Sequence, residues 1–361
     1  MLRCPYASDT MNPYYDPAKP HHRPDGFQNN HNEFTPKSLA EVLRWRWDAS
    51  RQGLPKPPQT PIPQVAADVA FLRSNAEAGV NMQPAVTWIG HATVMGQLGG
   101  LTLLTDPIFS LRASPASFVG PKRYQPPGVA LPELPRVDLV LVSHNHYDHL
   151  DGASVDALNR QPGGPPLFVV PLGLKAWLAG RGIRHAIELD WWQSHRIAAP
   201  GGEVEVMLVP AQHWSARGVN DRMNTLWGGF AVFAAHCHLF YAGDTGYSRD
   251  FSDMRERFAE RQSPAQGGGF DMALLPIGAY EPRWFMANQH VNVEEAVKIH
   301  LDLGAKRSLG VHWGTFALTD EPLDEPPRVL VQERLARGLG DDDFVTIAIG
   351  ETRRVPARVA G

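Results

Sequence analysis

The sequence reads LVSHNHYDHLD from Leu141 to Asp151, at the end of a β-type run that begins at Val137. Four side chains of metal-binding type lie within six consecutive positions of this stretch, namely His144, His146, Asp148 and His149. Because a buried strand ends here and a loop follows, several of these side chains can point to one place. Imidazole nitrogens together with a carboxylate suit zinc or a similar divalent first-row ion. The stretch therefore predicts a metal site at the carboxyl end of a strand.

More ligands are needed, because neighbouring side chains in a six-residue window diverge and cannot surround one tetrahedral ion. We expect the window to be divided between two ions. Three further candidates each follow a short apolar run: His213, Asp244 and His312. An aspartate can bridge two metals. The expected cofactors are two zinc ions, with other divalent first-row metals as alternatives.

The remainder of the chain indicates sheets covered by helices. From Val86 onward, short β-type runs end at polar or Gly/Pro boundaries, and helical patterns occur between them at 151–160, 173–182, 249–261 and 291–304. No repeat of fixed period is visible, which disfavours a solenoid or a propeller. The pattern is typical of a layered α/β architecture.

The first third of the chain has a different character. Residues 1 to about 35 are rich in Pro, Asn, His and Asp without periodicity, so we expect an extended arm there instead of a packed element. A helix is predicted at 38–53, and the proline-rich segment 54–64 cannot continue it. We divide the chain into an N-terminal arm and helix at 1–54 and one large domain at 55–361.

Composition excludes several functions. The 361 residues carry a formal net charge of −4 and no Lys/Arg-rich run, which argues against nucleic-acid binding. No apolar stretch approaches the roughly 20 residues of a membrane span, and the first residues lack the apolar centre of a secretory signal. We expect a cytoplasmic protein that can also be peripheral on the inner membrane. The two cysteines, Cys4 and Cys237, are expected to be ordinary thiols.

The metal stretch also carries a resemblance. HNHYDH matches the HxHxDH signature of the metallo-β-lactamase superfamily. More narrowly, the chain resembles the N-acylphosphatidylethanolamine-hydrolysing phospholipase D family from about Pro55 to its C-terminal region. The blocks that carry this likeness are WIGHATVMGQLGGLTLLTDPIFS, SHNHYDHLD, QHWSARGVNDRMNTLWGGF, YAGDTGYSRDF, LLPIGAYEPRWFM and HWGTFALTDEP.

The resemblance implies a four-layer αββα sandwich with two zinc ions at the edges of its sheets. One ion would be held by His144, His146 and His213, and the other by Asp148, His149 and His312. Asp244 would bridge the two ions. A further active-site histidine of the family corresponds to His290 in NQHVNVEE. Asp148 and His290 are therefore the predicted catalytic residues.

The implied reaction is attack of a hydroxide on the phosphorus of a phosphodiester. With the family's lipid, the products would be an N-acylethanolamine and phosphatidic acid, and a homodimer would be reasonable. Two alternatives stay open. One is a metal-dependent lactonase similar to the ascorbate-phosphate lactonases, because a fold does not choose a substrate. The other is a non-catalytic, envelope-associated protein that binds metal or lipid.

Several residues allow two interpretations each. His91 in IGHAT lies where the wider superfamily has a histidine near the site, and we expect it to have a hydrogen-bonding structural role. Tyr147 is equally compatible with substrate contact and with packing. The candidates for meeting a phosphate, whose commoner role would be ion pairing, are Arg217, Arg222 and Arg283.

The helix segment 38–51 also has two interpretations. Its tryptophans Trp45 and Trp47 suit a membrane interface, and its arginines at 44, 46 and 51 suit anionic headgroups. Packing of both tryptophans against the main domain is the alternative.

Overall fold

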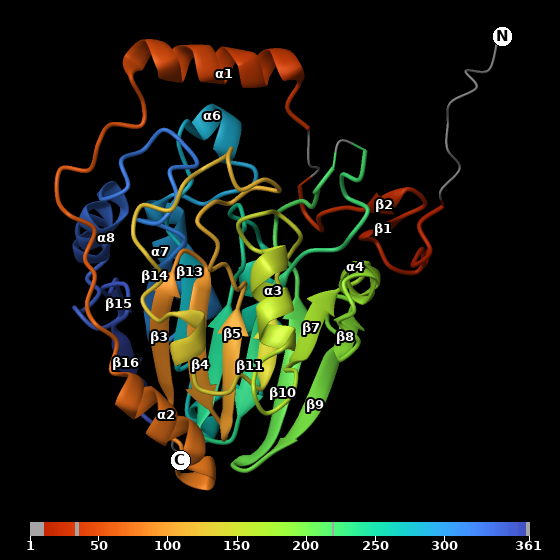
Figure 1. Cartoon of the computed structure of the whole chain (residues 1–361), viewed down its shortest axis with the longest axis vertical. Coiled ribbons are helices and arrows are strands. Elements are labelled where there is room, and N and C mark those ends of the chain that lie inside the picture. The colour runs from red at the N-terminus through yellow and green to blue at the C-terminus, as the bar shows by residue number, and fades with distance from the viewer. Residues whose placement is uncertain (1–10, 33–35, 219, 359–361) are drawn as a thin grey trace.

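The computed structural model describes residues 11–32, 36–218 and 220–358. Two seven-stranded mixed sheets lie face to face (Figure 1). The first has the order β16 (Thr352–Arg354), β3 (Ala85–Gly90), β4 (Thr93–Leu98), β5 (Leu101–Thr105), β6 (Leu139–Leu141), β7 (Leu167–Pro171) and β8 (Ala186–Leu189). The second has the order β15 (Phe344–Val345), β14 (Ser308–Val311), β13 (Met272–Pro276), β12 (Cys237–Tyr241), β11 (Gly229–Ala234), β10 (Gly202–Val209) and β9 (Ser194–Ala199).

Apolar side chains from both sheets form one buried core between them, to which Trp88, Leu141 and Phe240 all belong. Each sheet has an antiparallel part and a parallel part. Strands β16 to β5 are antiparallel and β5 to β8 parallel, while β9 to β12 are antiparallel and β12 to β15 parallel. Strands with both faces covered are mostly apolar, and β3, β5 and β13 are buried throughout.

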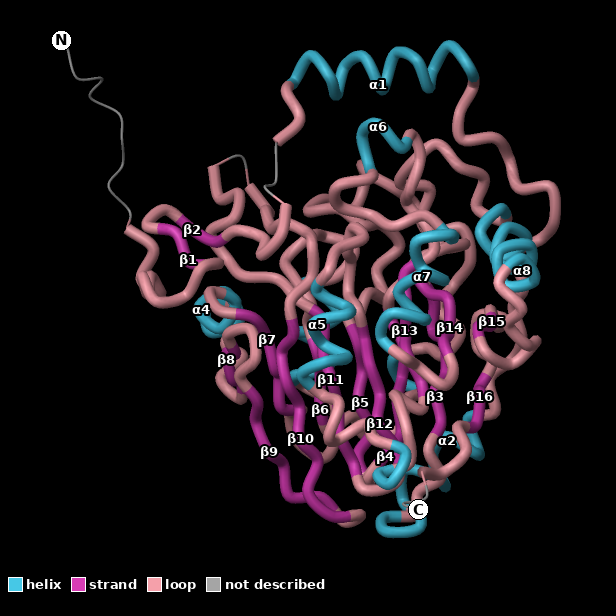
Figure 2. Tube along the Cα trace, turned by 180° about the vertical axis from the view of Figure 1, so that it is seen from behind, coloured by secondary structure: helices cyan, strands magenta, loops and turns pink. Residues whose placement is uncertain are grey.

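Helices cover the outer face of each sheet. The first sheet is covered by α2 (Val69–Glu77), α3 (Gly152–Asn159) and α4 (Leu174–Gly180), whose apolar residues form a second core with it. On the opposite side lie α5 (Asp250–Arg257), α7 (Val293–Leu303) and α8 (Glu325–Ala336), as Figures 1 and 2 show. The layers are therefore those of the expected αββα sandwich. Short 3₁₀ turns occur at Gly79–Asn81, Leu131–Glu133 and Pro264–Gln266.

Two of these helices were not predicted. The nine residues of α2 are few for a periodic pattern. Helix α8 begins with the sequence EPP, and the two prolines obscure it although proline is tolerated in a first helical turn. The four predicted helices of the sandwich are present as α3, α4, α5 and α7.

Helix α1 (Leu39–Gln52) is also present as predicted, and it lies across the short helix α6 (Arg283–Met286) (Figures 1 and 2). Ser38 and Glu41 form a reciprocal capping box at its start, and Gly53 ends it in the left-handed conformation. Trp45 packs with Phe285 of α6 in a small cluster separate from the two cores. Among the described residues, no helix is long and apolar enough to cross a membrane.

Residues 11–32, called here the N-terminal arm, are packed, so the expectation of an extended arm is wrong for them. They include the hairpin of β1 (His22–Arg23) and β2 (Gly26–Phe27) and a buried set of side chains: Asn12, His21, His22, Phe27 and Asn29. The polar members of this set are buried because they have hydrogen-bond partners: Asn12 within the arm, and His21, His22 and Asn29 in the main body. Residues 1–10, with Cys4, and residues 33–35 lie outside the described residues. The proposed boundary at residue 54 stays a prediction.

Candidate metal centre

Six strands of the two sheets deliver polar side chains to one place. All six end just before a residue of the candidate site: β3 before His91, β5 before Asp106, β6 before the segment 144–149, β10 before His213, β12 before Asp244 and β14 before His312. Within each sheet these strands run in the same direction. In the first sheet, β4 is antiparallel to both β3 and β5, and β6 is parallel to β5. In the second sheet, β11 is antiparallel to both β10 and β12, and β12, β13 and β14 are parallel. Residues as far apart in the sequence as His91 and His312 therefore meet at one end of the sandwich.

Three histidines form the first cluster, called here the three-histidine group: His144, His146 and His213. His144 Nε2 lies 2.8 Å from His146 Nδ1, and His213 Nε2 lies 3.3 Å from the same nitrogen. The rings of His144 and His213 are completely buried, at 0% exposed. The three nitrogens therefore converge on one point.

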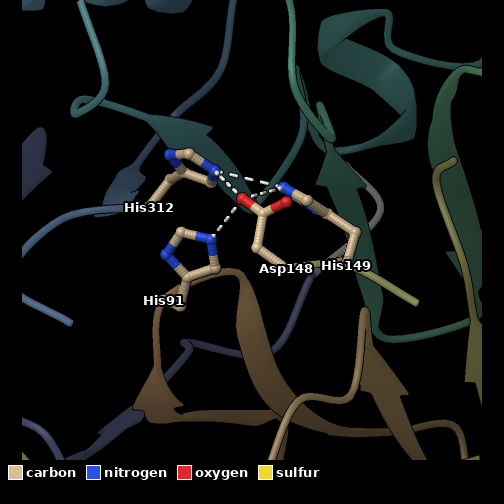
Figure 3. A group of neighbouring side chains, drawn as sticks. All are labelled: His91, Asp148, His149 and His312. Carbon is tan, nitrogen blue, oxygen red and sulfur yellow. Dashed lines mark hydrogen bonds and ion pairs between the residues drawn. The ribbon is translucent and has the colours of Figure 1, made fainter. Parts of the chain in front are cut away.

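A second cluster contains His91, Asp148, His149 and His312 (Figure 3), and we call the last three of these the mixed group. The Nε2 atoms of the two histidines are 3.1 Å apart. Asp148 Oδ2 lies 3.4 Å from His149 Nε2 and 3.5 Å from His312 Nε2. One carboxylate oxygen and two ring nitrogens thus form a second converging set.

Asp244 lies between the two groups. Its Oδ2 atom is 3.0 Å from His149 Nε2 and 3.9 Å from His213 Nε2, and its Oδ1 atom is 3.2 Å from His312 Nε2. Oδ1 is buried and accepts no hydrogen bond from the described residues. The structure therefore brings together all seven side chains that the sequence suggested as ligands.

The donor sets fit two divalent cations. Ring nitrogens that face each other at 2.8 Å and 3.1 Å would repel through their lone pairs unless a proton or a cation lies between them. Ligands of a tetrahedral zinc ion, bound at about 2.0–2.1 Å, lie roughly 3.3 Å apart, similar to the spacings in both groups. We propose that each group holds one ion.

Comparison with known proteins identifies the family of this chain. Residues 102–313 match the family model described as "Beta-lactamase superfamily domain". The chain is 41% identical over 274 residues to N-acyl-phosphatidylethanolamine-hydrolyzing phospholipase D 1 of Caenorhabditis elegans, which covers 73% of this chain and 74% of that protein. The chain belongs to the metallo-β-lactamase superfamily. Within it, the chain belongs to the family of these phospholipases and is a metal-dependent hydrolase.

Two further matches are more distant or less complete. The mitochondrial N-acyl-phosphatidylethanolamine-hydrolyzing phospholipase D of Saccharomyces cerevisiae is 38% identical over 260 residues, or 71% of this chain, and the chain spans about half (53%) of the yeast protein. A solved metallo hydrolase from the archaeon Ignicoccus hospitalis has a TM-score of 0.54 with 21% identity, covering 75% of this chain and 97% of that one. The solved structure shows the shared fold.

The metallo-β-lactamase scaffold supports its mixed group with two more side chains. His91 has the hydrogen-bonding role expected of it, since its Nε2 lies 3.0 Å from Asp148 Oδ2. Burial lowers the pKa of His91 to about 3, so the ring is neutral and donates its Nε2 proton to the carboxylate. Asp106 was missed in the sequence. Its Oδ2 lies 2.6 Å from His149 Nδ1, and Asp106 also accepts hydrogen bonds from the Ser143 amide and the Tyr241 hydroxyl.

Backbone strain is concentrated at this site. Non-glycine residues with positive φ include His91 (56°), Asp106 (33°) and His312 (62°). Gly243, directly before Asp244, has a φ of 64°, and a Cβ atom there would lie 2.7 Å from the Ser143 Cβ. Such conformations persist where the surrounding structure holds them, often at functional sites.

His290 lines a cavity of about 300 Å³ above the metal groups. Its Nδ1 atom is 3.8 Å from Asp244 Oδ2, and burial lowers the pKa of the ring to about 3. The cavity wall also includes His146, Tyr147, Asp148, Trp214, Met286, Gln289, Leu318 and Thr319. The predicted catalytic residues Asp148 and His290 therefore both face the space next to the metal groups.

Tyr147 and Arg217 interact through a hydrogen bond and a cation–π contact. The Tyr147 hydroxyl donates to the Arg217 carbonyl at 2.8 Å, and the Arg217 guanidinium lies 4.1 Å from the centre of the Tyr147 ring. Arg217 Nη1 also donates to the carbonyls of Asn145 at 2.8 Å and Leu150 at 2.7 Å. Arg217 thus fixes the loop that carries four proposed ligands.

The other two candidate arginines also contact the protein itself. Arg283 donates to the His290 carbonyl at 2.9 Å and to Glu295 Oε2 at 2.7 Å. The guanidinium of Arg222 lies 5.0 Å from the centre of the Trp214 ring. Arg283 therefore supports the backbone of His290, and Arg222 packs on a residue of the cavity wall.

Proposed function

We propose that this protein is a zinc-dependent phosphodiesterase of phospholipase D type, which hydrolyses N-acylphosphatidylethanolamine-like lipids to N-acylethanolamine and phosphatidic acid. The observation that carries this proposal is the pair of ligand groups joined by Asp244 beside one cavity. The name of the C. elegans relative supports the lipid class. The donor set of five histidines and two aspartates favours zinc, with other divalent first-row ions as alternatives.

Two ions held there would supply an activated water and would neutralise negative charge on the phosphoryl oxygens. The side chains of the protein have separate tasks. Asp148 accepts a hydrogen bond from His91 Nε2, so its carboxylate is held in one orientation next to the cavity. His290 faces the same cavity with a neutral ring, and we assign to it either orientation of the substrate or assistance to the leaving oxygen.

The decisive experiment is hydrolysis of N-acylphosphatidylethanolamine in oxygen-18 water, with mass spectrometry of both products. Attack on phosphorus places the label in the phosphate product and none in the released alcohol. Label in a carboxylate would instead support the lactonase alternative or another acyl hydrolase. Absence of turnover with every phosphodiester of a panel would contradict the proposal.

A lipid substrate also requires contact with a membrane. The two tryptophans of α1 differ in exposure, which decides which of them is available for this contact. Trp45 is buried, lies 4.8 Å from the Phe285 ring and donates Nε1 to Asp320 Oδ2 at 2.9 Å. Trp47 is 65% exposed, and so are Leu43 (59%) and Leu39 (74%) at four-residue spacing. Residues four apart share one side of a helix. We propose that this side of α1 contacts the bilayer.

Vesicle sedimentation tests this contact. The variant Leu43→Ser/Trp47→Ser removes apolar surface without disturbing Trp45, so we expect weaker binding to vesicles that contain anionic lipid. A control, Leu335→Ser, changes a similarly exposed residue (65%) on α8. Equal binding of both variants and wild type would exclude α1 from the contact. A homodimer and a cytoplasmic location stay predictions.

A further inference from the structure

The N-terminal arm reaches the candidate metal centre although it lies outside the matched family model, which begins at residue 102. Figures 1 and 2 show β1 and β2 beside α4, at the end of the sandwich where the strands deliver the site. The Phe27 amide donates to the Met223 carbonyl at 2.9 Å, which joins the arm to the loop after His213. After Phe27 the arm continues to Asn29, which contacts His213.

Asp190 anchors the beginning of the arm. Its carboxylate accepts from Lys19 Nζ at 2.6 Å and lies 2.7 Å from His21 Nε2 and 3.0 Å from His22 Nε2. The Trp191 amide also donates to it at 2.8 Å. With four partners, this buried carboxylate is fully satisfied, so we interpret the cluster as an anchor and not as a third metal site.

Asn29 makes the contact with the metal centre. Its side chain is 8% exposed, and its Oδ1 accepts from the backbone amide of His213 and from Trp227 Nε1, both at 3.1 Å. An amide oxygen has two lone pairs, and both are used here. Trp227 Nε1 also donates to the Ala211 carbonyl at 2.8 Å. The short segment 211–213 is therefore fixed from the side of the arm.

The same segment is fixed from the side of Asp244 as well. The Gln212 amide donates to Thr245 Oγ1 at 3.0 Å, and the Gln212 carbonyl accepts from Gly246 at 2.7 Å. Asn32 of the arm donates Nδ2 to Gln212 Oε1 at 2.5 Å. His213 thus sits between the arm and the backbone next to Asp244, while its own ring contacts the Gln289 carbonyl through Nδ1 at 2.9 Å.

We infer that the N-terminal arm is a structural part of the three-histidine group, with Asn29 as the residue that positions His213. The inference rests on the proposed ligand role of His213 and adds a residue that acts on it through its backbone. Loss of a hydrogen bond that orients a ligand typically weakens metal binding by about 10–100-fold. The effect should be confined to the ion of the three-histidine group, because Asn29 does not contact the mixed group in the structure.

The test measures zinc binding by competition with a chromophoric chelator, in proteins that keep one group each. His312→Ala disables the mixed group and His146→Ala disables the three-histidine group. Adding Asn29→Leu should weaken the remaining zinc site by about 10–100-fold in the first background and leave it unchanged in the second. Asn29→Asp, which keeps the acceptor oxygens, should restore affinity in the first background.

Asn30→Ala is the matched control, since Asn30 also lies on the arm but donates to Asp250 Oδ1 at 2.8 Å, away from the proposed ligands. It should leave both zinc affinities unchanged. Circular dichroism and thermal unfolding of every variant establish that it is folded. Unchanged affinity in both backgrounds, or equal weakening in both, would overturn the inference. Because the measurement is metal binding and not turnover, it does not depend on which bond the enzyme hydrolyses.

Discussion

The two halves of the candidate metal centre differ in what holds their ligands. In the mixed group, each of two ligands contacts a further side chain from a strand end: Asp148 contacts His91 after β3, and His149 contacts Asp106 after β5. Asp106 brings a negative charge next to a ring that would bind a cation. A carboxylate behind a histidine fixes the tautomer and raises the basicity of the coordinating nitrogen.

In the three-histidine group, the support comes from neutral groups. His144 Nδ1 lies 2.9 Å from Ser143 Oγ, and His213 Nδ1 lies 2.9 Å from the Gln289 carbonyl. His146 Nε2 is buried and has no hydrogen-bond partner among the described residues. A carboxylate reaches this group only indirectly, because the Ser143 hydroxyl that contacts His144 Nδ1 also donates to Asp106 Oδ2. We therefore expect the mixed group to bind its zinc ion more tightly than the three-histidine group does.

The largest effect on metal binding and hydrolysis should come from removing Asp244, which lies next to both groups. Asp244→Ala takes away the carboxylate next to both groups, so both ions should be weakened and hydrolysis should fall to the detection limit. Metal analysis of purified wild type should approach two zinc equivalents, and the variant should retain fewer than one. Full activity in this variant would end the interpretation with two joined ions.

A smaller, one-sided effect should follow from Asp106→Asn. The amide keeps the size of the side chain but removes the charge behind His149, so the zinc affinity of the mixed group should fall by about 10–100-fold. The three-histidine group should be affected little. Stepwise chelator titration measures both constants, and it should show the two affinities moving closer together or reversing their order.

The control for this variant is Asp156→Asn, which also removes an aspartate charge, from helix α3, but breaks only a partly exposed pair with Arg181. Its zinc constants should equal those of wild type. If Asp106→Asn weakens both ions equally, the difference between the halves does not arise from Asp106.

The sequence indicated the seven proposed ligands, which the structure brings together, but not the side chains that support them. His144, His146, Asp148 and His149 are visible because four donors are adjacent, and a short apolar run marks each of the other three. Asp106 carries a weaker signal: one aspartate after the run LTLLT looks like an ordinary turn residue. The signal that could have found it is its position at a strand end, which it shares with His213, Asp244 and His312.

Other parts of the site depend on partners far away in the sequence. Tyr147 and Arg217 are 70 positions apart, and nothing near either residue indicates their contact. The N-terminal arm lacks periodicity because its buried residues are fixed singly by distant partners, such as Asp190 for His22, and not by a repeating apolar face. Its composition therefore resembled that of an unpacked segment.

The smallest effect on metal binding should come from His290→Ala. The Nδ1 atom of this histidine lies 3.8 Å from Asp244 Oδ2, about as close as His213 Nε2 at 3.9 Å, so distance alone does not separate it from the ligands. We assign it to the substrate side because it lines the cavity. Zinc content should stay at the wild-type level while kcat falls, by about 10²–10⁴-fold if the ring exchanges a proton with the leaving oxygen. His236→Ala, at an exposed turn, is the control and should change neither quantity.

Loss of one zinc equivalent in His290→Ala would instead make His290 a ligand. It would then have to be added to the three-histidine group beside His213, whose ring centre lies 5.2 Å away. The three-histidine group would then have four ring nitrogens as ligands. We would in that case expect it to bind its zinc ion more tightly than the mixed group does.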